Sequence, residues 1–187
     1  MIRSRLLTVP LLAAAVLTTG CGYNRIQTLD EQVNVSRGQI ETQLQRRADL
    51  IPNLVETVRG VAAQESTLYT NIANARARLS GAVQSGDVGD MAAANAALSQ
   101  GLGRLLAIVE NYPELRSSES FLRLQDQLEG TENRISVARQ DYNGAVGEYN
   151  TLVRRFPTVI TAKIFGYDAR EYFEAEEGAQ EVPQVEF

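Results

Sequence analysis

FLRLQDQLEGTENRISVARQDYNGAVGEYNTLVRRF, residues 121–156, carries the most regular apolar pattern of the chain. Its members follow one another at alternating steps of three and four positions, and only Thr131 among them is plainly polar. They are Phe121, Leu124, Leu128, Thr131, Ile135, Ala138, Tyr142, Ala145, Tyr149, Leu152 and Phe156. Because this spacing places every member on one face of a helix, it predicts a long amphipathic helix. Ser118 with Glu119 offers a start for this helix, and Pro157 offers a stop.

A related pattern runs through the first half of the chain. Two rows of apolar residues repeat every seven positions, and polar Arg47 and Glu65 each interrupt one row. The rows are Ile26, Val33, Ile40, Leu54, Val61, Leu68 and Ala75, and Leu44, Ile51, Val58, Ile72 and Leu79. A repeat sustained over this length is typical of helices that pack lengthwise with coiled-coil character.

Pro52 lies inside this repeat and predicts either a kink or a new helix that is capped by Asp49. A four-helix arrangement needs a break in residues 49–52 or in residues 60–67. The unbroken apolar phase does not favour either position.

Residues 81–90, GAVQSGDVGD, contain three glycines and predict a loop that ends on Asp90 as a helix cap. From Met91 the apolar spacing predicts another amphipathic helix, which Pro113 closes. Its apolar members are Ala94, Leu98, Leu102, Leu105, Ile108, Val109 and Tyr112. Residues 158–165 are expected to form a short apolar turn.

Composition limits the function classes. The chain has 187 residues, which suits one sizeable core, and it contains no histidine. Histidine-based triads, zinc sites and di-iron bundles therefore lose their central member, and no catalytic, cofactor-binding or metal-ligating residue is predicted. The net charge of −5 and the absence of a basic stripe also argue against nucleic acid as a partner.

The amino terminus has the organisation of a secretory signal. Arg3 and Arg5 precede the apolar residues 6–17, and Thr18, Thr19 and Gly20 precede Cys21, the single cysteine. The apolar run is too short for an ordinary transmembrane helix. Residues 1–20 resemble a bacterial lipoprotein signal in which Cys21 is lipidated, although Thr18 stands where such signals usually carry leucine.

An internal disulfide is excluded for Cys21, and its other interpretation is a small buried residue. Two acyl chains on Cys21 would tether the chain to a membrane stably without spanning it. Gly22 follows the cysteine, and in bacteria with two membranes this resembles the default route to the outer membrane.

Three long segments resemble the LemA family of bacterial envelope proteins. They are QLQRRADLIPNLVETVRGVAAQE (residues 43–65), residues 102–157 with their NYPEL block, and YFEAEEGAQEVP (residues 172–183). The resemblance implies an elongated up-and-down antiparallel four-helix bundle, residues 21–166, displayed outside the cytoplasmic membrane. Relatives usually carry an amino-terminal transmembrane helix. The family has no agreed biochemical activity, and some relatives are linked with organising specialised membranes such as the magnetosome.

The family motif around Pro52 is a candidate interaction or structural motif. Its members are Arg46, Arg47, Asp49, Pro52 and Asn53. One interpretation is an exposed recognition or ion-pair site at a distorted helix. The favoured one is that the arginine stems cover the bundle while Asp49 caps or pairs. Asn53 and Glu65 would need polar partners if they pointed inward.

Two further sets of polar residues are candidates for catalysis or ligand binding. Glu110, Glu114, Glu129 and Glu132 are conceivable as paired carboxylates, but solvated helix faces are the favoured interpretation. Tyr142 and Tyr149, each followed by asparagine, are expected at core edges with hydroxyls that reach water, and sugar stacking is the alternative.

Gly166 opens an acidic tail, residues 167–187, whose single basic residue is Arg170. Its alternating end, Val182, Val185 and Phe187, predicts an extended segment that docks on its own bundle or on a partner's sheet edge.

The sequence therefore predicts a non-catalytic, membrane-tethered helical scaffold or adaptor of the bacterial envelope, facing away from the cytoplasm. Its expected partners are the membrane, through Cys21, and envelope proteins or further copies of the chain through helical faces. The alternative is a binder or hydrolase of cell-wall material that uses carboxylates and tyrosines in a cleft between helices.

Overall fold

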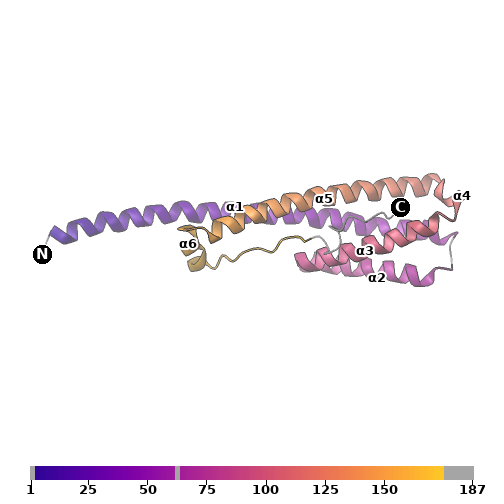
Figure 1. Ribbon diagram of the computed structural model, residues 1–187, viewed down its shortest axis with the longest axis horizontal. Helices are drawn as coiled ribbons and strands as arrows, with labels where there is room; N and C mark the ends of the chain where they lie inside the picture. Colours follow the sequence, from indigo (N-terminus) through magenta and orange to yellow (C-terminus); the bar gives the residue numbers. More distant parts are fainter. Residues whose placement is uncertain (1–2, 62–63, 175–187) are drawn as a thin grey trace, which may run out of the picture. The chain divides into compact units, whose positions relative to one another are not determined.

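The computed structural model describes residues 3–61 and 64–174, with side chains from Gly22 onward. Within these residues there are six helices and no strand, so the predicted all-helical class is confirmed (Figure 1). The helices are α1 (Arg3–Arg59), α2 (Ser66–Ser85), α3 (Val88–Val109), α4 (Pro113–Arg116), α5 (Glu119–Arg154) and α6 (Thr158–Phe165). The chain divides into two compact units, Met1–Arg37 with Asp141–Glu171, and Gly38–Gln140 with Tyr172–Phe187.

The first unit contains the amino-terminal part of α1, the end of α5, and α6. Its core consists of apolar and aromatic side chains from α1 and α5 and small side chains from α6. They are Ile26, Leu29, Val33, Tyr142, Val146, Tyr149, Val153, Thr158, Thr161 and Ala162. Residues 158–165, expected as a turn, form the two-turn helix α6.

The buried face of α5 departs from the predicted row after Tyr142. Val146 and Val153 are buried where the row predicts Ala145 and Leu152, and Phe156 is exposed. An α-helix of 3.6 residues per turn drifts by about 20° per heptad against a strict 3.5-residue repeat. The alternating pattern therefore still places Tyr149 on the buried face, but it misses that face at Ala145, Leu152 and Phe156.

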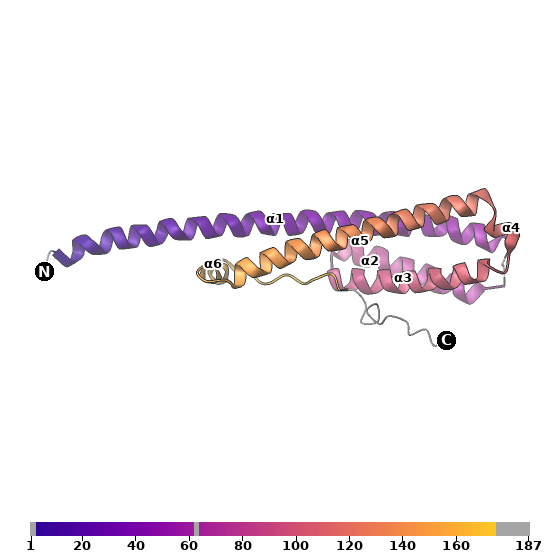
Figure 2. The same ribbon diagram turned by 45° about the horizontal axis from the view of Figure 1, so that its top comes forward.

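In the second unit, α2 and α3 run antiparallel and side by side in both views (Figures 1 and 2). Their shared core includes Ile72 and Leu79 from α2 and Leu98 and Leu105 from α3. Gly101 permits this close approach, because a Cβ atom at this position would lie 3.1 Å from Cγ1 of Ile72.

Helix α1 runs through Pro52, so the predicted new helix capped by Asp49 is wrong. Proline lacks the N–H that would serve the carbonyl of Ala48, four residues earlier. That carbonyl accepts a hydrogen bond from Nε of Arg76 on α2 at 2.8 Å. The arginine thus satisfies the group that the proline leaves without a helical partner, and the helix continues.

The break in the first long pattern lies after Arg59, inside the predicted range 60–67. Val61 is exposed, and Tyr69 is buried where the row predicts Leu68. The predicted rows therefore fail at Val61 and Leu68, within and just after the connection, and resume with Ile72, Ala75 and Leu79, which are buried. The guanidinium of Arg59 lies over the ring of Tyr69, 5.0 Å from its centroid.

The connection between α2 and α3 is much shorter than the predicted loop of residues 81–90. α2 extends to Ser85, and Gly86 ends it in the left-handed conformation with φ 72°. The helix cap is Asp87 and not Asp90, because the Asp87 side chain accepts the N–H of Asp90 at 2.8 Å. Three glycines within ten residues suggested a loop, but only Gly86 has positive φ there.

The remaining helix ends follow the sequence closely. α3 ends at Val109, and Pro113 opens the short helix α4. α5 begins at Glu119 with the Phe121 N–H donating to Oγ of Ser118, and it ends three residues before Pro157. Among the described residues, α3 alone is long and apolar enough to pass for a membrane span, a test that core helices of soluble proteins also pass.

Candidate functional site

The family motif on α1 divides between the interior and the surface of the second unit. Arg47 is buried, with 6% of its surface exposed, whereas Arg46, Asp49, Pro52 and Asn53 are exposed. Asp49 does not cap a helix but accepts a hydrogen bond from the Gln45 amide at 2.9 Å. The motif therefore contributes one buried charged side chain, Arg47, and four exposed residues on the surface of α1.

Arg47 is the centre of a buried polar cluster between three helices. Its Nη1 donates to Oδ1 of Asn95 on α3 at 2.7 Å and lies 2.5 Å from Oε2 of Glu132 on α5. Its Nε is buried and has no hydrogen-bond partner. Burial lowers the pKa of the Arg47 guanidinium, and the Glu132 carboxylate opposes this effect.

A pocket of about 230 Å³ adjoins this cluster, between α1, α3 and α5. Four of its ten lining residues are leucines, and Arg47, Glu129 and Glu132 add charge. This arrangement has the shape and polarity to take a small apolar group beside a guanidinium. Arg46 lies apart from it, in a surface hollow of about 330 Å³ that it shares with Arg123, Asp126 and Arg134.

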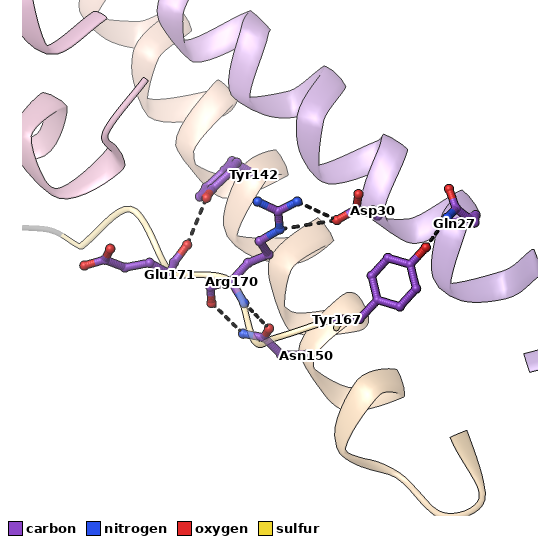
Figure 3. Close-up of polar contacts among 7 residues, drawn as sticks. All are labelled: Gln27, Asp30, Tyr142, Asn150, Tyr167, Arg170 and Glu171. Carbon is purple, nitrogen blue, oxygen red and sulfur yellow. Dashed lines mark hydrogen bonds and ion pairs between the residues drawn. The ribbon is translucent and has the colours of Figure 1, made fainter. Parts of the chain in front are cut away.

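In the first unit, the chain after α6 forms an extended segment, residues 167–171, here called the strap. Gly166 turns into it with φ 73°. Asn150 on α5 holds the strap through two hydrogen bonds to the backbone of Arg170 (Figure 3). The Arg170 N–H donates to Oδ1 of Asn150 at 2.8 Å, and Nδ2 of Asn150 donates to the Arg170 carbonyl at 2.9 Å. The Tyr142 hydroxyl donates to the Glu171 carbonyl at 2.9 Å.

Side chains of the strap also reach α1. Nη2 of Arg170 lies 2.8 Å from Oδ1 of Asp30, and the Gln27 amide donates to the Tyr167 hydroxyl (Figure 3). The hydrogen bond to Asp30 raises the pKa of Arg170. The strap therefore ties α1, at Gln27 and Asp30, to the last third of α5 within the first unit.

The two tyrosines of α5 differ from the sequence expectation. Tyr142 and Tyr149 are 2% and 1% exposed, and the Tyr142 hydroxyl donates to the backbone carbonyl of Glu171. Burial raises the pKa of both phenols. These residues hold the strap and the core, and they do not line any pocket described above.

The acidic residues considered for catalysis do not gather in one place. Glu129 and Glu132 lie on α5 beside the Arg47 pocket, whereas Glu110 and Glu114 are exposed near α4. Asn53 and Glu65 are exposed and have no need of interior partners. Among the described residues, no three Asp, Glu or Cys side chains come close enough to hold a metal ion.

Several residues of these clusters escaped the sequence analysis. Asn95 and Asn150 lie on helix faces whose sequence pattern is set by the neighbouring apolar residues, so nothing local marks them as polar contacts. Arg76 was missed because it binds a carbonyl that a proline on another helix leaves without its helical donor. Arg170 had a signal, because it is the single basic residue of its acidic segment. The Cys21 side chain and the predicted docking residues Val182, Val185 and Phe187 lie outside the described residues.

Comparison with known proteins agrees with the sequence motifs. Magnetosome proteins MamQ 1 and MamQ 2 of Paramagnetospirillum magneticum are each 29% identical over 195 residues, covering 92% of this chain and 71% of the relative. Magnetosome protein MamQ of Magnetospirillum gryphiswaldense is 27% identical over 185 residues, covering 87% and 68%. The LemA family profile matches residues 36–187, more than half of the chain. As its motifs predicted, the chain belongs to the LemA family.

Proposed function

We propose that this chain is a membrane-tethered helical scaffold or adaptor of the bacterial cell envelope. It acts by presenting helical faces to envelope proteins or to further copies of itself, and not by catalysis. The lipid group on Cys21 holds it to a membrane on the side away from the cytoplasm. In a host with two membranes, that membrane is the outer one.

The continuity of α1 is the observation that carries this proposal. Cys21 lies in the same helix as the core residues Ile26, Leu29 and Val33. Once residues 1–20 are removed, the lipidated cysteine stands at the start of this helix, so the anchor and the folded part of the chain are joined without a linker. A tethered scaffold needs such a direct connection, because it positions its faces close to the membrane.

We further propose that α1, α2, α3 and α5 form an up-and-down four-helix bundle within the second unit. Three side-chain contacts support this arrangement. Arg47 links α1 to α3 and α5, and Arg76 links α2 to α1. Membership of a family whose relatives are magnetosome proteins also supports a role in membrane organisation.

The scaffold role is favoured over the alternative role in cell-wall binding or hydrolysis. The alternative requires carboxylates and tyrosines to meet in one cleft. Glu129 and Glu132 line the Arg47 pocket, but Tyr142 and Tyr149 are buried beneath other parts of the first unit. The buried polar side chains Arg47, Asn95 and Asn150 join elements of the fold to one another.

The anchor is tested by fractionating cells that produce the full chain or its Cys21→Ser variant. We expect the full chain in the membrane fraction, soluble only with detergent, and the variant to lose its acyl chains. Thr18→Leu is the matched control, because it brings the signal closer to the usual lipoprotein pattern. A Cys21→Ser chain that is processed like the full chain, and differs from it in mass only by the exchange of sulfur for oxygen, would contradict the lipid anchor.

The scaffold role is tested by photocrosslinking in intact cells. A crosslinker at exposed Asn53 should capture a defined envelope protein or a second copy, whereas one at buried Leu54 should not. Turnover or saturable binding of purified cell-wall fragments, abolished by Glu129→Gln with Glu132→Gln, would contradict the proposal in favour of the alternative.

A further inference from the structure

We infer that α6, together with the preceding Phe156, is a membrane-interfacial element that rests its exposed apolar face in the lipid surface. This inference rests on the proposed membrane tether and adds a second, non-covalent contact with the bilayer. It concerns only residues of the first unit.

Four large apolar side chains are exposed in and beside α6. Phe156 is 75% exposed, Ile160 51%, Ile164 72% and Phe165 59%. Phe156, Ile160 and Ile164 follow at intervals of four, while Thr158, Thr161 and Ala162 are buried against the rest of the unit. The four residues, here called the apolar patch, thus face away from the core that α6 covers, and patches of this kind mark interaction surfaces.

The place of α6 along α1 points to lipid as the occupant of the patch. Gly22 is the residue after Cys21, and a Cβ atom there would lie 3.4 Å from Cγ2 of Thr158. α6 therefore packs on α1 within one residue of the predicted lipidation site. Cys21 is the point at which the chain is proposed to attach to the bilayer. Because α6 packs beside this point, α6 lies at the level of the membrane surface.

Aromatic residues gather at this level of the first unit. The ring of Tyr23 lies 4.8 Å from that of Phe165 and 6.2 Å from that of Tyr167, measured between centroids. Tyrosine and its amphipathic ring are enriched at the boundary between lipid and water. Tyr23 follows Cys21 by two positions, so this contact places Phe165 and Tyr167 beside the predicted lipidation site, as expected for residues that sit among lipid headgroups.

The charge of the segment fits an anionic lipid surface. Residues 149–167 contain Arg154, Arg155 and Lys163 and no Asp or Glu, in a chain with a net charge of −5. All three basic residues are exposed. A short amphipathic helix with an apolar face and flanking cations is the usual composition of an interfacial helix.

The test uses the absence of tryptophan from the natural chain. The mature lipidated chain with Ile164→Trp, extracted from the envelope with detergent, is reconstituted into vesicles of phosphatidylethanolamine and phosphatidylglycerol whose acyl chains carry bromine, which quenches indole fluorescence on contact. We expect several-fold stronger quenching than for Val137→Trp, an exposed position on α5 in the second unit. Phe156→Trp, an aromatic replacement, is the second probe if Ile164→Trp does not fold.

A triple variant, Arg154→Gln with Arg155→Gln and Lys163→Gln, tests the charge contribution. Each Lys or Arg near an anionic surface raises the membrane partition constant of its segment about fivefold. Removal of the three cations should therefore weaken the contact of α6 with lipid and clearly reduce quenching of the indole at position 164. Unchanged quenching would overturn the role of the cations.

Three outcomes would overturn the inference. Quenching at positions 164 and 156 no greater than at position 137, in chains that float with the vesicles, would show that the tether exists without an interfacial α6. A blue-shifted but unquenched indole would mean that protein, such as a second copy, covers the patch. Failure of the chain to float would reject the tether as well, so flotation separates the two claims.

Discussion

Pro52 shows how one side chain on another helix decides whether a helix continues. Sequence reasoning expects a kink or a new start at this proline, because the carbonyl of Ala48 loses its N–H partner. Arg76 supplies that partner from α2 at 2.8 Å. No pattern near Pro52 contains this information, since Arg76 follows 24 positions later, which is the difference between the two residue numbers.

This explanation predicts coupling between the two residues. Arg76→Met should destabilise the chain by about 1–2 kcal/mol, because a carbonyl inside a helix loses its donor. In a Pro52→Ala background, residue 52 regains its N–H, and the same change should cost about 1 kcal/mol less. Urea unfolding of the four chains measures this coupling. Equal losses in both backgrounds would contradict it.

The ion pair of Arg47 with Glu132 predicts that two glutamates on α5 differ in how much they contribute to stability. Glu132→Gln leaves a buried guanidinium with only neutral partners and should cost about 1–3 kcal/mol of unfolding free energy. The Glu132 side chain is 48% exposed, so the cost should stay below that of a fully buried ion pair. Glu129→Gln is the control, because the amide can still accept from Gln125. Similar losses for the two variants would mean that the ion pair contributes little.

Tyr142 and Tyr149 predict a loss of stability at high pH. Their folded-state pKa is raised above the ordinary value of about 10, so the unfolded chain releases these protons first. The unfolding free energy should therefore be undiminished below pH 10 and fall as pH rises through the folded-state pKa. Tyr142→Phe with Tyr149→Phe should flatten this decline in urea titrations, and an equally steep decline would rule these phenols out as its source.

The helices show what the sequence could and could not predict at the scale of an element. The start of α5 after Ser118 and its stop before Pro157 follow from local capping and proline chemistry. The buried residues Val146 and Val153 were missed, because a seven-residue repeat does not track a straight helix over its whole length. Asn95 and Asn150 were missed because their partners come from distant elements.

The connection between α2 and α3 offers the sharpest test at this scale. Asp87→Ala should cost about 1 kcal/mol, because it removes the side chain that accepts the N–H of Asp90. Asp90→Ala, at the position predicted from sequence, should cost less, since Asp90 contributes only a charge in the first turn. Thermal unfolding of the two variants measures these losses. A larger loss for Asp90→Ala than for Asp87→Ala would support the longer loop that was predicted from the sequence.

At the scale of the whole molecule, the sequence predicted the family and the all-helical class from its motifs and periodicity. It did not predict the division into two compact units, because both α1 and α5 contribute to each of them and no break in pattern marks the boundary. The sequence identified the strap only as the start of an acidic tail, since its hydrogen bonds use backbone groups that composition does not reveal.

The central claim is the tether that begins at Cys21. The most direct measurement is the intact mass of the amino-terminal tryptic peptide of the mature chain, residues 21–25, from envelope extracted with detergent. The proposed account predicts a peptide that begins at Cys21 and carries acyl chains. A peptide that continues into the apolar residues 6–17, or an unmodified cysteine, would contradict the lipid anchor and leave Cys21 an ordinary small residue.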